Sequence, residues 1–257
     1  MAKKRATKQS RRSIRAEDMT QFKLVSDPQV SPSAEQVVFV VKQIGDKNDY
    51  LTRLWLVDTA GGVPRQFTSG RKDRSPRWSP DGRQVAFVSE REDKNPQVYL
   101  IGIDGGEATA LTRFPEGSIG KFSWSPDGRY LAISFREQHP DWTREAEKQR
   151  AETGASLPPR AAENAWYRLD GDGYFLEQRY QLYLVDTESG EHRVLYNRDT
   201  VGSFSFDFAP DGRELVVSVN RDKRPMPRFW RDELLRIDIE TGKANRITGM
   251  PEGPKER

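Results

Sequence analysis

The sequence predicts an all-β protein, a β-propeller in which four four-stranded blades are present. Two observations support this prediction. A four-residue turn motif begins at positions 31, 79, 125 and 209, so successive copies lie 48, 46 and 84 residues apart. Each copy is flanked by short segments rich in β-branched and aromatic residues, which favour strands over helices. A period of this length is typical of propeller blades.

The turn motif, which we call the anchor, joins two strands as a hairpin. Its copies are Ser31-Pro32-Ser33-Ala34, Ser79-Pro80-Asp81-Gly82, Ser125-Pro126-Asp127-Gly128 and Ala209-Pro210-Asp211-Gly212. Proline fixes φ, the aspartate side chain bonds to the local backbone, and glycine accepts a positive φ. The segments after the anchors are Gln36–Val41, Gln84–Val88, Tyr130–Phe135 and Glu214–Val219. Each has the composition and length of a buried strand.

Two further strands complete each blade. One ends in an aspartate followed by a glycine-containing turn, and its copies are Leu54–Asp58, Val98–Asp104, Leu182–Asp186 and Leu234–Asp238. A last short strand follows that turn, as in Arg65–Thr68 and Asn245–Thr248. With the strand that enters the anchor, each unit has four antiparallel strands. Trp55, Trp78 and Trp124 fall on such strands, where packing in the core is expected.

The blades are predicted at about 25–70, 71–114, 115–199 and 200–248, and the third contains an insertion at 137–179. Because a fifth anchor would fall near position 255, we expect an incomplete ring from a longer chain. A ring closed by four blades is the alternative, since propellers have about four to eight. Residues 1–24 are predicted to be a basic, disordered tail with a short lead-in to the propeller, which then occupies 25–257.

Charge and composition restrict the classes of function. The formal net charge is +3, yet seven lysines and arginines lie within the first 15 residues, so the remaining chain is mildly acidic. We therefore expect no nucleic-acid partner. No apolar run is long enough for a membrane span or follows the basic residues as in an export signal, which predicts a cytoplasmic protein without membrane contact. The absence of cysteine excludes disulfides and a cysteine nucleophile.

The insertion is the segment with the most interest for function, because long loops within compact domains are often functional. Its strong helix formers predict a short exposed helix over 143–152. The candidate residues for a substrate entrance or an interdomain contact are Trp142, Trp166, Tyr167, Arg168 and Tyr174. One interpretation is that this segment shapes a substrate entrance or docks on a catalytic domain. The other is that it is a surface flap whose aromatic residues pack for stability.

Neither a metal nor a cofactor is predicted. His139 and His192 are separated by strands and have no carboxylate at ligand spacing. The stretch from Asp170 to Gly173 has the opening of a calcium loop, but its twelfth position is Gln181 rather than an acid. We expect a turn with solvated carboxylates there. The basic, proline-rich segment 221–228 is expected to be a solvated loop.

The repeats resemble the WD40-like repeats of TolB-type propellers. Residues 16–32 (AEDMTQFKLVSDPQVSP) resemble the opening of bacterial prolyl-oligopeptidase-family (S9) serine peptidases of the acylaminoacyl-peptidase and dipeptidyl-peptidase type. Residues 166–175 (WYRLDGDGYF) resemble a stretch within the same peptidases. The resemblance implies a propeller that restricts access by substrate size, followed by an α/β-hydrolase domain with a Ser-Asp-His triad.

The chain departs from those peptidases in the catalytic part. The segment Gly154-Ala155-Ser156-Leu157-Pro158 lacks the second glycine of a nucleophile elbow, and no alternation of strands and helices is present. We assign no catalytic residue and expect this chain alone to be inactive. The resemblance implies a substrate-gating propeller of a peptidase acting on short or N-acylated peptides. Its partners would be a C-terminal α/β-hydrolase domain absent here, a peptide substrate, and possible further copies in a homo-oligomer. The alternative is a stand-alone TolB-like propeller that serves as a protein-binding scaffold.

Overall fold

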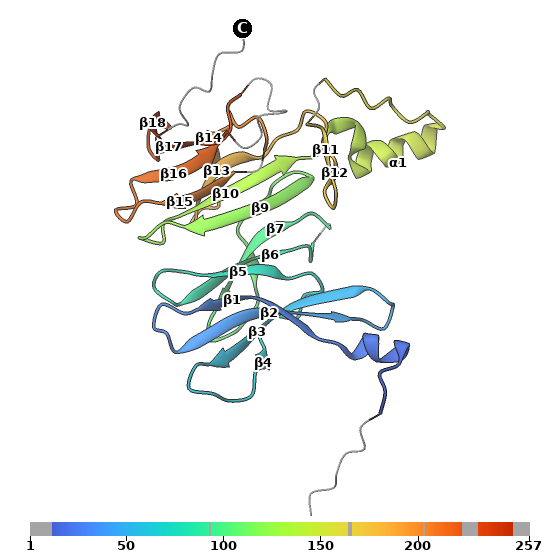
Figure 1. The fold of residues 1–257 in the computed structure, drawn as a ribbon, viewed down its shortest axis with the longest axis vertical. Coiled ribbons are helices and arrows are strands. Elements are labelled where there is room, and N and C mark those ends of the chain that lie inside the picture. The colour runs from blue at the N-terminus through green and yellow to red at the C-terminus, as the bar shows by residue number, and fades with distance from the viewer. Residues whose placement is uncertain (1–11, 93, 164–165, 203, 223–230, 249–257) are drawn as a thin grey trace, which may run out of the picture.

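The computed structural model describes residues 12–92, 94–163, 166–202, 204–222 and 231–248 (Figure 1). Over these residues the chain forms four four-stranded antiparallel sheets, which confirms the predicted four blades. Blade 1 consists of β1 (Leu24–Val30), β2 (Gln36–Ile44), β3 (Tyr50–Asp58) and β4 (Arg65–Gln66). Blade 2 consists of β5 (Arg74–Trp78), β6 (Gln84–Ser89), β7 (Gln97–Gly102) and β8 (Thr109–Ala110).

Blade 3 is interrupted by the insertion. It consists of β9 (Gly117–Trp124), β10 (Tyr130–Glu137), β13 (Gln181–Asp186) and β14 (His192–Tyr196). Blade 4 consists of β15 (Ser205–Phe208), β16 (Glu214–Val219), β17 (Glu233–Asp238) and β18 (Ala244–Thr248). The insertion holds η2 (Pro140–Trp142), α1 (Arg144–Thr153), β11 (Arg168–Leu169) and β12 (Gly173–Tyr174), and a 3₁₀ turn, η1 (Ala16–Gln21), precedes blade 1. No helix in the described part of the chain is long and apolar enough to cross a membrane.

Part of the predicted 1–24 tail lies outside the described residues, which begin at position 12. Most of the basic loop at 221–228 also lies outside them.

The anchors form the hairpin turns that the sequence predicts. In blade 2, the Ser79 hydroxyl donates to Asp81 at 2.6 Å and accepts the Gln84 amide at 3.0 Å. Gly82 has a φ of +71°, a region that favours glycine. A Cβ added at Gly82 would lie 3.6 Å from Pro32. A Cβ added at Gly128 or Gly212 would lie 3.7 Å from Pro80 or 3.4 Å from Pro126. The second, third and fourth anchors therefore each pack on the proline of the preceding anchor.

The blades pack face to face. We call the side of a blade that meets the preceding blade its leading face and the opposite side its trailing face. The leading face of blade 2, formed by Val85, Phe87, Tyr99 and Ile101, is at most 5% exposed. It packs against the trailing face of blade 1, formed by Val38, Val40, Leu54 and Leu56. Burial of each such side chain stabilises the fold by about 1.5–3 kcal/mol, so these seams are the core of the protein.

Hydrogen bonds between the first strands of adjacent blades reinforce the seams. The indole of Trp78 donates to the Gln29 carbonyl at 2.9 Å, and the indole of Trp124 donates to the Arg77 carbonyl at 3.2 Å. Between blades 3 and 4, where Phe208 replaces the tryptophan, the Ser123 hydroxyl donates to Asp207 at 2.9 Å. The first strands thus follow one another in chain order from β1 to β15.

The anchors and the insertion lie at opposite ends of the strands. The anchors join the first and second strands of each blade, whereas the insertion joins the second and third strands of blade 3. The η1 turn, which precedes the start of β1, lies on the same side as the insertion (Figure 1). We call this side the insertion end.

Candidate functional site: the insertion end of blade 3

The insertion leaves blade 3 at Glu137 and returns to it at Gln181. Its helix α1 begins at Thr143, whose hydroxyl accepts the Ala146 amide at 3.2 Å, and it ends at Gly154 in the left-handed region. No residue of α1 is buried. The predicted exposed helix over 143–152 is therefore confirmed, with bounds one residue later at each end.

Arg136 at the end of β10 fastens the β11–β12 hairpin to blade 3. Its guanidinium donates two hydrogen bonds to the Asp172 carboxylate, at 2.8 and 2.6 Å. It also lies between two aromatic rings, 5.1 Å from the centroid of Phe175 and 4.7 Å from that of Tyr180. Only 11% of the Arg136 side chain is exposed. Bidentate, partly desolvated pairs of this kind are the strong ones.

This contact corrects one prediction. The turn from Asp170 to Gly173 was expected to carry solvated carboxylates, and Asp170 is indeed fully exposed, but Asp172 binds Arg136. The sequence prediction was wrong for Asp172 because the hairpin folds back onto β10, and the two partners lie 36 positions apart in the sequence.

A second buried arginine fixes the return of the insertion. Arg179 donates to the carbonyls of Trp166 at 2.7 Å, Leu176 at 2.6 Å and Thr200 at 2.9 Å. Burial lowers the pKa of Arg179, and the nearby Arg136 lowers it further. The indole of Trp166 in turn donates to the Val201 carbonyl at 2.6 Å. Trp166 therefore holds the insertion to the connection between blades 3 and 4.

Tyr167 also serves this attachment through its backbone. Its carbonyl accepts the amides of Phe175 and Leu176, both at 3.0 Å. Phe175 and Leu176 are each 5% exposed. Of the five candidate residues, Trp166 and Tyr167 thus take part in the attachment of the insertion to the blade.

The remaining candidates lie together toward solvent. The guanidinium of Arg160 lies 4.3 Å from the ring centroid of Trp142 and 4.4 Å from that of Tyr174. We call these three residues the Arg160 stack. Arg168 lies 5.2 Å from the centroid of the Tyr174 ring, and the ring of Tyr167 lies 6.1 Å from the same ring. Arg160 forms no hydrogen bond or ion pair with any residue in the described ranges, so its N–H groups face solvent.

The Arg160 stack is suited to binding rather than catalysis. A guanidinium with free donors pairs with a carboxylate in bidentate geometry, and aromatic faces accept apolar or cationic side chains. Tyr174 is 46% exposed, which leaves its ring accessible. Sequence analysis missed Arg160, because nothing in the polar segment around Pro158 and Pro159 distinguishes that arginine from other charged residues.

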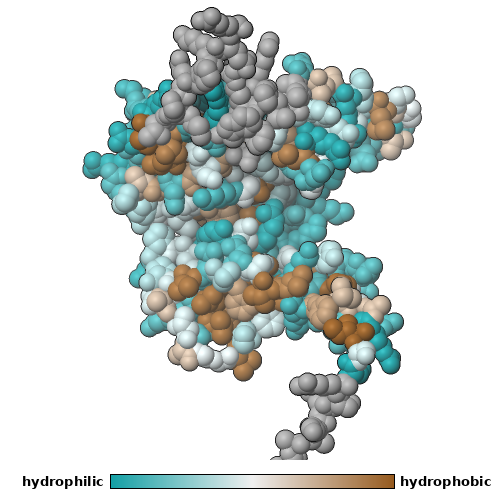
Figure 2. All heavy atoms as spheres, in the orientation of Figure 1, coloured by the Kyte–Doolittle hydropathy of each residue, from teal (hydrophilic) through white to brown (hydrophobic). Residues whose placement is uncertain are grey.

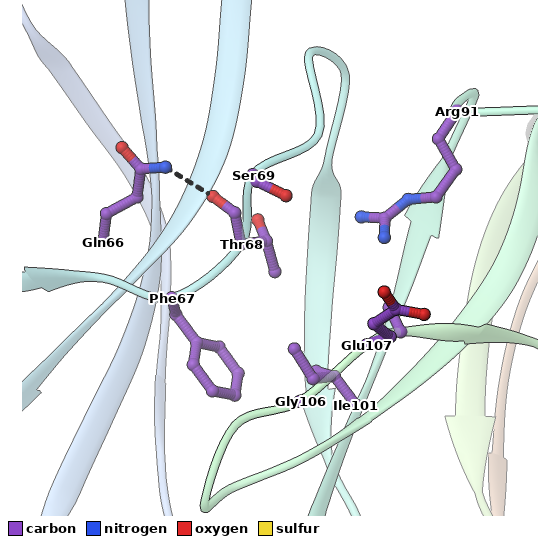
Figure 3. Close-up of a pocket in the computed structure, with 9 residues that line it drawn as sticks. Gln66, Phe67, Thr68, Ser69, Arg91, Ile101, Gly106 and Glu107 are labelled. Atoms are coloured by element: carbon purple, nitrogen blue, oxygen red, sulfur yellow. Dashed lines mark hydrogen bonds between the residues drawn. The ribbon is translucent and has the colours of Figure 1, made fainter.

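Two pockets between blades are weaker candidates for a binding site than the Arg160 stack. One, of about 450 Å³, lies at the seam of blades 1 and 2 (Figure 3). Gln66 and Thr68 lie on one side of it and Arg91 and Glu107 on the other, but the Arg91 guanidinium is engaged by Asp73 at 3.1 Å. A smaller pocket of about 210 Å³ lies between blades 3 and 4 and is lined by Lys121, Ser134 and Tyr180 among others. Burial raises the pKa of Tyr180, which keeps its hydroxyl protonated.

Comparison with known proteins gives three findings. The family model described as the TolB beta propeller domain matches residues 7–157. The uncharacterized peptidase YuxL of Bacillus subtilis is 34% identical over 209 residues, which is 80% of this chain and 31% of that protein. The acylaminoacyl peptidase of Pyrococcus horikoshii has a similar structure, with a TM-score of 0.67 at 19% identity, over 90% of this chain and 33% of that one.

A propeller solved by itself is also similar. The β-propeller domain of the Trilobed protease from Pyrococcus furiosus matches with a TM-score of 0.57 at 18% identity, over 89% of this chain and 58% of that one. The resemblance to the propeller portions of such peptidases, expected from residues 16–32 and 166–175, is confirmed by these relatives. The chain spans about a third of the length of the Bacillus peptidase and of the acylaminoacyl peptidase.

Proposed function

Because this chain belongs to the TolB beta propeller domain family and its 34% identical Bacillus relative is a peptidase, we propose that it is the substrate-gating propeller portion of a serine peptidase. The substrates would be short or N-acylated peptides. The catalytic Ser-Asp-His residues would belong to an α/β-hydrolase domain outside these 257 residues. In this role the chain itself binds and orients peptides and excludes larger polypeptides.

The observation that supports this proposal best is the Arg160 stack. A peptide bound there would place its C-terminal carboxylate on the free guanidinium of Arg160 and a side chain against Trp142 or Tyr174. A site that holds a free C-terminus favours short peptides, because a long polypeptide rarely presents its terminus at a fixed distance from the cleaved bond. The rigid attachment through Arg136 and Arg179 would keep this site in position.

The test uses the peptidase as its source cells make it, and compares Arg160→Ala with the unmodified protein on peptides of increasing length. We expect KM for peptides with a free carboxylate to rise about 5–20-fold, the loss of about 1–2 kcal/mol of a charge-assisted bond, while kcat is unchanged. Peptides with an amidated C-terminus should show no change. Lys148→Ala in α1 is the matched control, because Lys148 only approaches exposed Glu152 at 4.0 Å. Equal KM values for Arg160→Ala and Lys148→Ala would refute the role of the stack.

A stand-alone scaffold remains the second candidate function, and the family model supports it, since that model describes TolB propellers. The two candidates differ in one simple measurement. The native polypeptide should hydrolyse aminoacyl or peptidyl p-nitroanilides if the peptidase proposal is correct. An inert native polypeptide that co-purifies with a stoichiometric protein partner would favour the scaffold.

A further inference from the structure

Arg74 begins β5, the first strand of blade 2, and its side chain is half-buried. It lies opposite Val88 in β6, and Val88 is fully buried in one cluster with Phe122 of blade 3. Opposite residues of antiparallel strands project to the same face of a sheet. The side chain of Arg74 is therefore carried on the face of blade 2 that meets blade 3, at the insertion end of this seam.

Arg74 differs from the arginines around it in its lack of a partner. Arg77, in the same strand, donates to Asp27 at 2.9 Å, and Arg136 on the facing blade donates to Asp172 at 2.6 Å. Arg74 forms no hydrogen bond or ion pair with any residue in the described part of the chain. A half-buried charge without a partner is unfavourable, so this guanidinium is a candidate for binding an anion.

The groups around Arg74 leave one positive charge unbalanced. Burial lowers the pKa of Arg74, and the nearby Glu90 and Tyr180 raise it in part. The Glu90 carboxylate already accepts a hydrogen bond from Lys72 at 2.6 Å, so one carboxylate serves two cations. Burial raises the pKa of Tyr180, whose phenol is therefore neutral. A single further negative charge would complete the balance at this place in the seam.

Tyr180 supplies a hydroxyl on the other side of the seam. The indole of Trp124 donates to the Arg77 carbonyl, so β9 runs beside β5 and its start lies near Arg74. The Tyr180 ring packs on this part of β9, since a Cβ added at Gly120 would lie 3.3 Å from the ring. Tyr180 also acts electrostatically on Arg74, which requires its phenol to lie near the guanidinium. The seam therefore holds two hydrogen-bond donors at one place.

The backbone beside Arg74 is irregular. The pairing of β5 with β6 shifts register between Arg74 and Arg77, and Ser75 has a φ of +55°. A non-glycine residue in this region of φ costs free energy, and bulges often redirect a side chain beside a binding site. The bulge therefore sets the direction of the Arg74 side chain separately from the regular strand that follows.

A carboxylate is the anion that fits these groups. A guanidinium pairs with a carboxylate in planar, bidentate geometry, and a phenol hydroxyl can donate to the same oxygens. A carboxylate carries the single negative charge required, whereas a phosphate monoester carries about −1.5 to −2 and would be repelled by Glu90. Figure 2 shows mainly hydrophilic residues across the middle of the molecule, where blades 2 and 3 meet, in keeping with a polar ligand.

We propose that Arg74 and Tyr180 form a binding site for the carboxylate of an acidic side chain in a bound peptide. The choice of a peptide as ligand rests on the proposed function, whereas the Arg160 stack and hydrolysis are not required for binding here. The Arg160 stack would hold the C-terminus of a peptide, and this second site would select glutamate or aspartate within it. The propeller would thus prefer certain sequences as well as short lengths.

The experiment measures peptide binding by calorimetry in the polypeptide as its source cells make it, after a serine-directed fluorophosphonate has blocked cleavage. The ligands are five-residue alanine peptides with glutamate at each position in turn, and matched peptides with glutamine. Both ends of each peptide are capped, so that no terminal carboxylate can bind Arg160. We expect at least one glutamate peptide to bind about 10-fold tighter than its glutamine counterpart, as a charge-assisted hydrogen bond would give.

Variants locate the site. Arg74→Met should remove the preference for glutamate, because it keeps the length of the side chain without its charge. Arg213→Met is the matched control, since Arg213 is exposed at the anchor end of blade 4 and has no hydrogen bond or ion pair within the described ranges. Tyr180→Phe should reduce the preference by a smaller factor. Both arginine variants should keep the melting temperature of the unmodified protein, because neither guanidinium has a partner to lose.

Three results would overturn the proposal. The first is equal affinity for every glutamate and glutamine pair in the unmodified protein, a comparison that needs no variant. The second is a preference for glutamate that survives in Arg74→Met. The third is a melting temperature of Arg74→Met far below that of Arg213→Met, which would identify Arg74 as a structural residue. A preference that depends on Arg74, in a protein that hydrolyses no p-nitroanilide, would support the site and refute the peptidase role.

Discussion

The attachment of the insertion to blade 3 through Arg136 and Asp172 can be tested quantitatively. Removal of the guanidinium by Arg136→Ala takes away two charge-assisted hydrogen bonds and the contacts with Phe175 and Tyr180. Hydrogen bonds to charged groups contribute about 1.5–3 kcal/mol, and a partly buried cation–π contact adds about 1 kcal/mol. Asp172 is 33% exposed and can regain water, which reduces the loss. We expect the closed hairpin to lose about 2–3 kcal/mol.

Hydrogen exchange measures this loss locally. The amides of Phe175 and Leu176 are bonded to the Tyr167 carbonyl, so they exchange when the hairpin opens. A loss of about 2–3 kcal/mol corresponds to exchange about 30–150-fold faster at these two amides. The amide of Val217 in blade 4, a residue with no exposed surface, should keep its protection if the effect is confined to the insertion.

The partner variant and a control complete the experiment. Asp172→Asn should accelerate exchange at the same two amides, and the double variant with Arg136→Ala should show a coupling free energy of about 1–2 kcal/mol. Arg168→Ala, in the same hairpin, removes an exposed contact to Asp170 at 3.9 Å and a contact with the exposed ring of Tyr174, and should change exchange little. If Arg136→Ala and Arg168→Ala accelerate exchange equally, the proposed attachment is wrong.

Two further predictions concern the blades. Trp78→Phe removes the indole donor to the Gln29 carbonyl and should lower the free energy of unfolding by about 1–2 kcal/mol in urea titrations, whereas Trp55→Phe, at a half-buried position in β3, should cost less. Burial raises the pKa of Tyr196 to about 12, so the stability from its neutral phenol is complete below about pH 10 and is lost as the pH rises toward 12. Tyr196→Phe should change stability at pH 7 by under about 1 kcal/mol, because the buried hydroxyl has no hydrogen-bond partner in the described structure, and should flatten the decline measured between pH 10 and 12. A decline in Tyr196→Phe as steep as in the unmodified protein would show that other groups cause it.

The fold was predictable because its signals are local and repeated. The four residues of each anchor are sufficient to predict a hairpin turn. The β-branched and aromatic composition of the flanking segments predicts strands. The helix α1 was predictable for the same reason, since Thr143 and the following helix formers act within one turn. Structure that depends on interactions within a few residues can therefore be predicted from a single sequence.

The candidate site was less predictable because its contacts are not local. Arg160 reaches Trp142 and Tyr174 from a proline-rich segment with no regular structure, and Arg136 finds Asp172 only after the hairpin folds back. Sequence analysis selected Trp142, Trp166, Tyr167, Arg168 and Tyr174 but missed Arg136 and Arg160. Trp166 and Tyr174 looked alike in sequence, yet one holds the insertion to the blade and the other faces solvent.

The position of the insertion has a consequence for the order in which the blades form. Between the last paired residues Phe135 and Gln181 of the central hairpin of blade 3, the chain must close a loop over 136–180, whereas the corresponding loop of blade 1 covers only 45–49. Loop-closure entropy grows with the logarithm of loop length, so this nine-fold difference adds about 2 kcal/mol to the initiation of blade 3. Blades 1 and 2 can therefore nucleate from short hairpins during synthesis, while blade 3 waits for some 45 further residues to leave the ribosome. The segment that shapes the end of the mature propeller thus also sets the timing of its assembly.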